Sequence, residues 1–175
     1  MNLDPTPPLP KRKNVRIGVL GSGFIVSDCH LVSYRKCGFN PVAIASRTKA
    51  NATKTAERHG IAKVYDSYEQ LIDDPTIEVL DIAVPPQNQF DLIKDICQRK
   101  TAKGILAQKP LGIDYAQAKE AVRLCERAGI VLAVNQNMRY DPSVRATKSL
   151  LDSGSLGQPV LATIDMRGIP HFMPW

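Results

Sequence analysis

Short apolar runs rich in β-branched residues alternate with longer amphipathic stretches from Val15 to Val134. The run at 78–84 is nearly continuous, as expected for a strand covered on both faces. This alternation predicts β-α-β units and hence a parallel sheet. We expect strands at 15–20, 42–45, 64–65, 78–84, 104–107 and 130–134, and helices at 24–36, 48–59, 88–99 and 114–128 with a short one capped by Ser67. Six such strands predict an α/β fold with a doubly wound parallel sheet.

The two ends of the chain lack this pattern. Residues 1–14 carry prolines at positions 5, 7, 8 and 10 without apolar periodicity, which predicts an extended or disordered lead-in. The sheet domain is expected to span residues 15–138. Residues 139–175 predict the beginning of an incomplete α+β domain, with a helix at 142–151 and a strand at 159–166 that lacks its sheet partners.

Composition excludes several classes of protein. The formal charge of +6 is dispersed among acidic neighbours after the basic residues at 11–13, so we expect no nucleic-acid partner. The four cysteines form no Cys-x-x-Cys pair and no histidine stands at zinc-ligand spacing, so we expect no metal. No apolar run approaches the roughly 18 residues of a membrane span, and residues 1–14 lack the apolar stretch expected of a secretory signal. We therefore expect a cytoplasmic protein without membrane contact.

A glycine-rich turn follows the first predicted strand directly, in Gly21-Ser22-Gly23-Phe24-Ile25-Val26. Gly21 allows the tight turn, and Gly23 lets the backbone approach a pyrophosphate at the helix N-terminus. These residues predict a dinucleotide site. The third glycine position holds Val26, which weakens the helix-packing argument but leaves the phosphate contacts intact. A plain structural turn is the alternative.

The end of the second predicted strand indicates which dinucleotide is bound. NAD-binding sheets place an Asp or Glu there to accept the ribose 2′-hydroxyl, whereas this chain has Ser46 and Arg47. A hydroxyl and a guanidinium suit a 2′-phosphate instead, since Arg forms charge-assisted forks with phosphates. We therefore expect NADP, with NAD less favoured. The alternative is that Arg47 is a solvated residue at a helix start.

Lys109 ends the fifth predicted strand, in Gln108-Lys109-Pro110. Pro110 keeps Lys109 out of the helical region, so the lysine is presented at the carboxyl edge of the sheet, where ligands bind. A lysine there can orient a substrate hydroxyl or donate to a developing alkoxide during hydride transfer. A surface lysine before a turn is the alternative.

These motifs, in this order, resemble those of the glucose-fructose oxidoreductase, inositol dehydrogenase and related (Gfo/Idh/MocA) family, from Val15 to about Trp175. Gln108-Lys109-Pro110 is similar to the family's Glu-Lys-Pro signature, with Gln replacing Glu. The resemblance implies a Rossmann domain, a catalytic role for Lys109, and a second domain whose acid or base lies beyond residue 175. It also implies the following cofactor-binding residues: Gly21, Gly23, Phe24, Ile25, Ser46, Arg47, Pro85, Pro86, Gln89, Gln108, Lys109, Asn137 and Arg139.

The resemblance further implies an NADP-dependent oxidoreductase acting on a sugar, polyol or similar small substrate, and a homo-oligomer formed through the C-terminal region. Two departures leave a non-catalytic NAD(P)-binding sensor as the alternative, namely Gln108 and the absence of a histidine at the Gln89 position. A methyl-donor enzyme is disfavoured because it needs an acidic residue at the end of the second strand. His30, His59 and His171 are expected to have structural or loop positions only.

Overall fold

The computed structural model describes residues 6–165, and the chain divides into two compact units. The first unit is Pro8–Gln136, and the second combines Met1–Pro7 with Asn137–Trp175. The strand expected at 159–166 falls outside the described residues at its last position, and His171 lies wholly outside them.

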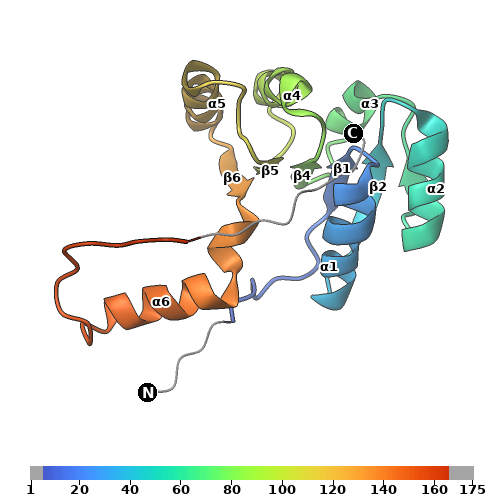
Figure 1. The fold of residues 1–175 in the computed structure, drawn as a ribbon. Coiled ribbons are helices and arrows are strands. Elements are labelled where there is room, and N and C mark those ends of the chain that lie inside the picture. The colour runs from blue at the N-terminus through green and yellow to red at the C-terminus, as the bar shows by residue number, and fades with distance from the viewer. Residues whose placement is uncertain (1–5, 166–175) are drawn as a thin grey trace. The chain divides into compact units, whose positions relative to one another are not determined.

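The first unit is built on a single sheet of six parallel strands, in the order β3-β2-β1-β4-β5-β6 (Figure 1). The strands are β1 (Ile17–Leu20), β2 (Pro41–Ala45), β3 (Lys63–Val64), β4 (Val79–Ile82), β5 (Gly104–Gln108) and β6 (Val131–Asn135). This order is that of the doubly wound Rossmann fold, in which the chain reverses direction across the sheet between β1 and β4. The predicted fold class is therefore confirmed.

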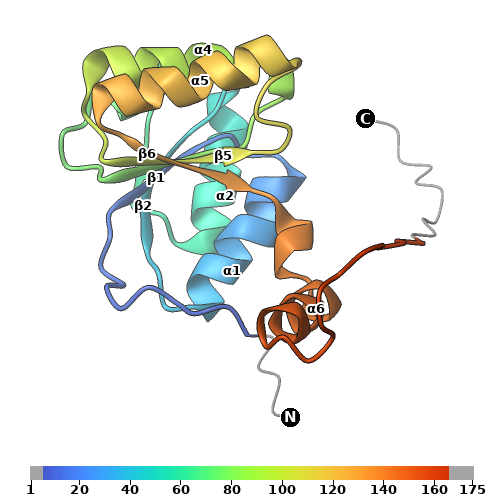
Figure 2. The ribbon, with the colours of Figure 1, turned by 90° about the vertical axis from the view of Figure 1, so that its left-hand side faces the viewer.

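Helices cover both faces of this sheet. They are η1 (Ile25–His30), α1 (Leu31–Lys36), α2 (Lys49–His59), α3 (Tyr68–Ile72), α4 (Pro86–Arg99) and α5 (Tyr115–Ala128). The views in Figures 1 and 2 place α4 and α5 on one face and α1 and α2 on the other. Two buried clusters match this division, one joining the strands to α3, α4 and α5, the other joining them to η1, α1 and α2.

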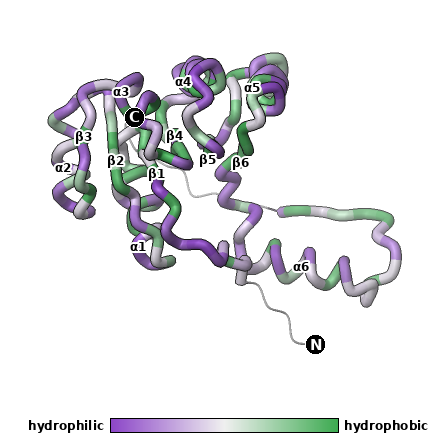
Figure 3. The backbone as a smooth tube through the Cα atoms, turned by 180° about the vertical axis from the view of Figure 1, so that it is seen from behind, coloured by the Kyte–Doolittle hydropathy of each residue, from purple (hydrophilic) through white to green (hydrophobic). Residues whose placement is uncertain are grey.

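The sequence signals that start and stop these helices act as expected. The Ser67 and Asp114 side chains cap α3 and α5 by accepting the N–H groups of Gln70 and Gln117. Gly60 and Gly129 end α2 and α5 in the left-handed conformation. The amphipathic helices contribute apolar residues to the two buried clusters against the sheet. Figure 3 shows hydrophobic stretches, in green, along several of the strands.

The predicted helix at 24–36 differs from the structure in its first part. Residues 25–30 form a π-helix, η1, in which the N–H of Leu31 donates to the carbonyl oxygen of Val26, five residues earlier. The wider turn leaves Val26, Ser27 and His30 buried. Hydrophobic periodicity does not distinguish this spacing from that of an α-helix, because single π turns occur within otherwise regular helices.

The lead-in contains no helix or strand at residues 6–16, where it is described. Its last part is nevertheless held by the sheet unit. The Arg12 guanidinium donates to both Glu78 carboxylate oxygens at 2.7 and 2.9 Å, and Lys13 Nζ donates to the Cys37 carbonyl oxygen. The ordered sheet unit thus begins a few residues before the first strand.

The second unit contains η2 (Asn137–Tyr140), a 3-10 helix, and α6 (Pro142–Asp152). The predicted helix at 142–151 is therefore present, capped by Asp141. The prediction of a strand at 159–166 was wrong for residues 159–165, which form no helix or strand. An alternating pattern becomes a strand only when a neighbouring strand satisfies its backbone, and the described residues offer none here. No helix among residues 6–165 is long and apolar enough to cross a membrane.

Candidate nucleotide-binding site

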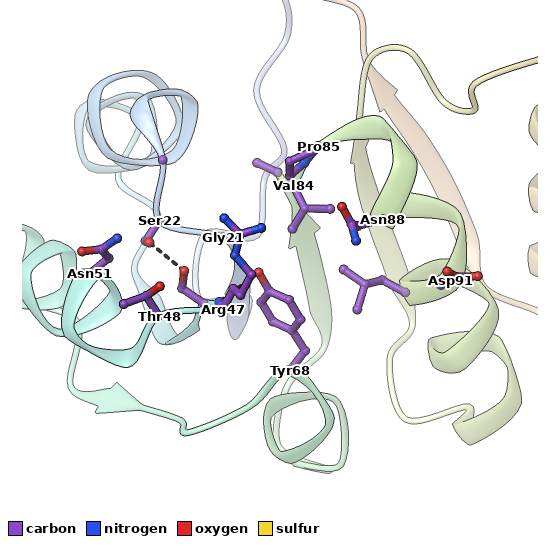
Figure 4. Close-up of a pocket in the computed structure, with 14 residues that line it drawn as sticks. Gly21, Ser22, Arg47, Thr48, Asn51, Tyr68, Val84, Pro85, Asn88 and Asp91 are labelled. Carbon is purple, nitrogen blue, oxygen red and sulfur yellow. Dashed lines mark hydrogen bonds between the residues drawn. The ribbon is translucent and has the colours of Figure 1, made fainter. Parts of the chain in front are cut away.

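A pocket of about 420 Å³ opens where β1, β2 and β4 reach their carboxyl ends (Figure 4). It therefore lies at the point where the order of strands reverses, which is where open α/β sheets bind their ligands. The sequence-predicted residues that line it are Gly21, Gly23, Ser46, Arg47 and Pro85. Residues separated by more than sixty positions in the sequence thus meet around one cavity.

Gly21 and Gly23 have different roles in the turn after β1. Gly21 has a φ of +124°, and its N–H donates to the Ala45 carbonyl oxygen at 2.9 Å, which ties the turn to β2. A Cβ atom at Gly21 would collide with the carbonyl oxygen of Ala83. A Cβ atom at Gly23 would instead project into open space, with no atom within 4 Å. Gly21 is required by the fold, whereas Gly23 leaves room for a close ligand.

The turn after β1 is joined to the end of β2 by a serine pair. Ser22 Oγ donates to Ser46 Oγ at 2.8 Å, as the dashed line in Figure 4 shows. Ser46 is buried, so its hydroxyl has a fixed place beside the glycine turn. The sequence indicated Ser46 but not Ser22, because a contact between two loops leaves no trace in a local pattern.

Arg47 lies at the exposed rim of the pocket. Its backbone N–H donates to the Tyr68 hydroxyl oxygen at 3.2 Å, which fixes the backbone from which the guanidinium extends. Within the described part of the chain, Arg47 has no carboxylate at ion-pair distance, whereas nearby Lys49 pairs with Asp66. Arg47 therefore offers an uncommitted positive charge to a ligand.

The sequence missed several polar residues of the pocket wall: Ser22, Thr48, Asn51, Tyr68, Asn88 and Asp91. Thr48, which starts α2, has an extended backbone, and its side chain makes no capping hydrogen bond. The wall beside α2 therefore combines a helix N-terminus with Arg47, and the wall beside α4 carries the Asp91 carboxylate. Polar residues in the first turn of the helix that follows each strand are the sequence signal that could have identified them.

The remaining predicted residues of the first unit lie outside the pocket wall. Phe24 and Ile25 are exposed at the start of η1, and Pro86 is the first residue of α4. Lys109 is exposed directly after β5, and its peptide bond to Pro110 is cis. Asn137 and Arg139 belong to η2 in the second unit, where both are exposed.

Gln89 was expected to contact the cofactor, but it is 1% exposed and lies inside the protein. Its Oε1 accepts the N–H of Gln108 at 2.8 Å, and its Nε2 donates to the carbonyl oxygen of Gln108 at 2.8 Å. The same nitrogen lies 3.0 and 3.2 Å from the carbonyl oxygens of Pro110 and Leu111. Gln89 thus clamps the turn that carries Lys109.

The profile of the oxidoreductase family GFO_IDH_MocA, described as having an NAD-binding Rossmann fold, matches residues 15–136. This chain belongs to the Gfo/Idh/MocA family.

No group of three or more His, Cys, Asp or Glu side chains that could hold a metal ion occurs among residues 6–165.

Relatives within the Gfo/Idh/MocA family include named enzymes. The chain is 30% identical over 168 residues to trans-1,2-dihydrobenzene-1,2-diol dehydrogenase of Mus musculus, covering 92% of this chain and 50% of the relative. It is 26% identical over 162 residues to 1,5-anhydro-D-fructose reductase of Ensifer adhaerens, covering 91% and 48%. The chain thus spans about half the length of these curated relatives.

A solved Gfo/Idh/MocA structure has the same architecture. The 3-ketoreductase of Actinomadura kijaniata, in complex with TDP-benzene and NADP, aligns with a TM-score of 0.71 and 26% identity. The alignment covers 81% of this chain and 44% of the ketoreductase. The resemblance noted from the motifs is therefore confirmed in both sequence and fold.

Proposed function

We propose that this chain is the nucleotide-binding part of an NADP-dependent oxidoreductase that acts on a small sugar-like or diol-like substrate. The observation that carries the proposal is the position of Ser46 and Arg47 at the pocket that opens beside the glycine turn. A neutral hydroxyl and a cation at this place favour a phosphate over a ribose diol.

The residues around the pocket suit two parts of NADP, namely its pyrophosphate and its 2′-phosphate. The open space at Gly23 and the N-terminus of η1 that follows it fit a pyrophosphate. The N-terminus of α2, with Thr48 and Arg47, would hold the 2′-phosphate. A cation at a helix start is unfavourable on its own, and a bound phosphate would offset that cost.

Lys109 is the candidate catalytic residue. The nicotinamide, when bound, supplies or accepts the hydride. Lys109 leaves β5 at the carboxyl edge of the sheet, where it would orient the substrate hydroxyl or donate to a developing alkoxide. The names of the dihydrodiol dehydrogenase and anhydrofructose reductase relatives support a carbinol or carbonyl substrate.

We also propose a cytoplasmic location and a homo-oligomer formed through the C-terminal region. The four cysteines are free thiols, although Cys97 Sγ and Cys125 Sγ lie only 3.6 Å apart, which suits a reducing compartment. The exposed apolar side chains of Val160, Leu161 and Ile164 suit a contact with another surface. Light scattering of the full chain would measure the oligomeric state.

Calorimetric titration with NADPH and NADH tests the cofactor proposal. We expect NADPH to bind at least about tenfold more tightly than NADH, and Arg47→Ala to remove most of that difference. Lys49→Ala is the matched control. It also removes one positive charge, two residues after Arg47, but the Lys49 side chain is already paired with Asp66. Equal affinities for the two nucleotides in the unmodified chain would contradict the NADP proposal, and binding of neither would contradict the site.

A further inference from the structure

A buried polar cluster lies behind the turn that carries Lys109. It consists of His30, Tyr34, Asp81, Gln108 and Asn135, and we call it the His30 cluster. Its members come from η1, α1, β4, β5 and β6. Asp81 is 0% exposed and His30 is 8% exposed, so these two members are shielded from water, whereas Tyr34, Gln108 and Asn135 are half-buried. Buried polar groups of this kind hold one another in fixed orientations.

Asp81 determines which nitrogen of His30 carries a proton. Its Oδ2 lies 2.8 Å from His30 Nδ1 and accepts the Tyr34 hydroxyl proton at 2.9 Å. Burial, and then the Asp81 charge, raise the pKa of Tyr34, so its hydroxyl stays protonated and donates. Asp81 Oδ1 has no hydrogen-bond partner among the described residues. The carboxylate therefore depends on its two donors at Oδ2, one of which is the Nδ1–H of His30.

The other ring nitrogen of His30 faces two amide groups. Asn135 Nδ2 lies 2.7 Å from His30 Nε2, and Gln108 Nε2 lies 3.3 Å from it. Amide nitrogens donate hydrogen bonds and do not accept them. His30 Nε2 must therefore be the acceptor, which makes His30 a neutral imidazole with its proton on Nδ1.

Gln108 connects this imidazole to Lys109. The Gln108 amide faces His30 through Nε2, while its Oε1 accepts the backbone N–H of Lys109 at 2.9 Å. The backbone of Gln108 is held independently by Gln89. Because Gln89 holds the Gln108 backbone, the contact with His30 determines only how the side-chain amide of Gln108 is oriented.

We propose that neutral His30 is a positioning residue for Lys109, acting through the side-chain amide of Gln108. The inference rests on the proposed function in one respect, namely that Lys109 is the reactive lysine. A proton added to Nε2 would face the donor groups of both Asn135 and Gln108, so both amides would have to turn an oxygen toward His30. Lys109 N–H would then lose its acceptor.

The charged and titratable neighbours of His30 are few. Asp81 faces it from β4 and Tyr34 from α1. On η1 itself, Asp28 forms an ion pair with Arg58 from α2 at 2.8 Å. A change in the charge of His30 is therefore transmitted mainly through Asp81 and through the two amides.

The test is NMR spectroscopy of the ¹⁵N-labelled full chain, with the ring nitrogens of His30 and the amide of Lys109 as reporters. At neutral pH we expect the proton on Nδ1 and an unprotonated Nε2. As the pH falls, the Lys109 amide resonance should move together with the protonation of His30. A proton on Nε2 at neutral pH, or a Lys109 amide that does not follow His30, would overturn the proposal.

Gln108→Glu gives a sharper readout, since a carboxylate beside Nε2 favours the charged imidazole. At neutral pH, the ring nitrogen signals of His30 in this variant should show a proton on Nε2 as well as on Nδ1. His59→Asn is the matched control, because His59 lies at the end of α2 and should leave the Lys109 amide unchanged. Unaltered ring nitrogen signals of His30 in folded Gln108→Glu protein would count against the coupling.

NADPH titration separates this inference from the proposed function. The titration is made on the unmodified chain, because the resemblance assigns Gln108 itself to the cofactor. A chain that binds no nucleotide but shows the expected His30 and Lys109 signals would refute the function and leave the coupling intact. A chain that binds NADPH without those signals would refute the coupling alone.

Discussion

The carbonyl oxygen of Ala83 occupies the space that a Cβ atom on Gly21 would need. This relationship places the turn after β1 directly against the end of β4, and both residues line the candidate pocket. The φ of +124° at Gly21 is a second reason for glycine there, because other residues rarely adopt it.

Gly21→Ala should therefore lower the free energy of unfolding by roughly 2–4 kcal/mol, from backbone strain together with the clash. Chemical denaturation measures this change. Gly23→Ala is the control, since its Cβ would meet no atom within 4 Å and its stability should change by less than about 0.5 kcal/mol. Gly23→Ala should instead weaken NADPH binding, because the methyl group enters the space proposed for the pyrophosphate. Equal stability of the two variants would contradict this assignment.

Ser46→Asp should reverse the nucleotide preference. A carboxylate at the end of β2 accepts the ribose hydroxyls of NADH and repels a 2′-phosphate. We expect NADPH affinity to fall at least about tenfold while NADH affinity rises, as measured by calorimetry. Ser46→Ala is the companion variant, because it removes the hydrogen bond to Ser22 without adding charge. Tight NADPH binding by Ser46→Asp would show that the 2′-phosphate lies elsewhere.

Gln89→Leu should destabilise the sheet unit. It removes the hydrogen bonds to the backbone of Gln108, Pro110 and Leu111 and leaves buried polar groups without partners. The expected loss is roughly 2–4 kcal/mol, measured by denaturation. Asn88→Ala, at the exposed neighbouring position, should cost much less. A stable Gln89→Leu protein would mean that the Lys109 turn does not need this clamp.

Glu78 should make stability depend on acid pH. Its carboxylate accepts hydrogen bonds from the Arg16 backbone N–H, which has the larger effect, and from the Arg12 guanidinium. Together they lower the pKa of Glu78 from 4.5 to about 2. A carboxyl group whose pKa is lowered by folding stabilises the protein above the unfolded value and loses that contribution as the pH falls toward the folded one. Thermal unfolding between pH 7 and pH 2 should show a shallower decline for Glu78→Gln. An identical pH profile for Glu78→Gln and the unmodified chain would contradict this prediction.

Local patterns predicted what depends on neighbours in the sequence. The six strands, the glycine turn and the cap at Ser67 follow from periodicity and from a side chain that bonds to its own helix. The strand expected at 159–166 failed at 159–165, because a strand depends on a partner that a local pattern does not contain.

The parts of the site that escaped prediction are contacts between distant elements. Tyr68 meets Arg47 across 21 positions, and Asp81 meets His30 across 51. Asp81 stands within an apolar run, so the sequence indicates a buried strand and gives no sign of its partner. Gln89 was assigned to the cofactor by resemblance, whereas its burial gives it a structural task at the Lys109 turn.

The most direct test of the account is a map of the backbone amide shifts that NADPH causes in the ¹⁵N-labelled chain. Binding at the strand-reversal pocket predicts the largest shifts in the turn at Gly21–Gly23, at Ser46–Thr48 and at Asn88, with smaller ones on the outer surface of α5. Shifts that centre on another part of the sheet, or no shifts at saturating NADPH, would contradict the central claim that this pocket is the dinucleotide site.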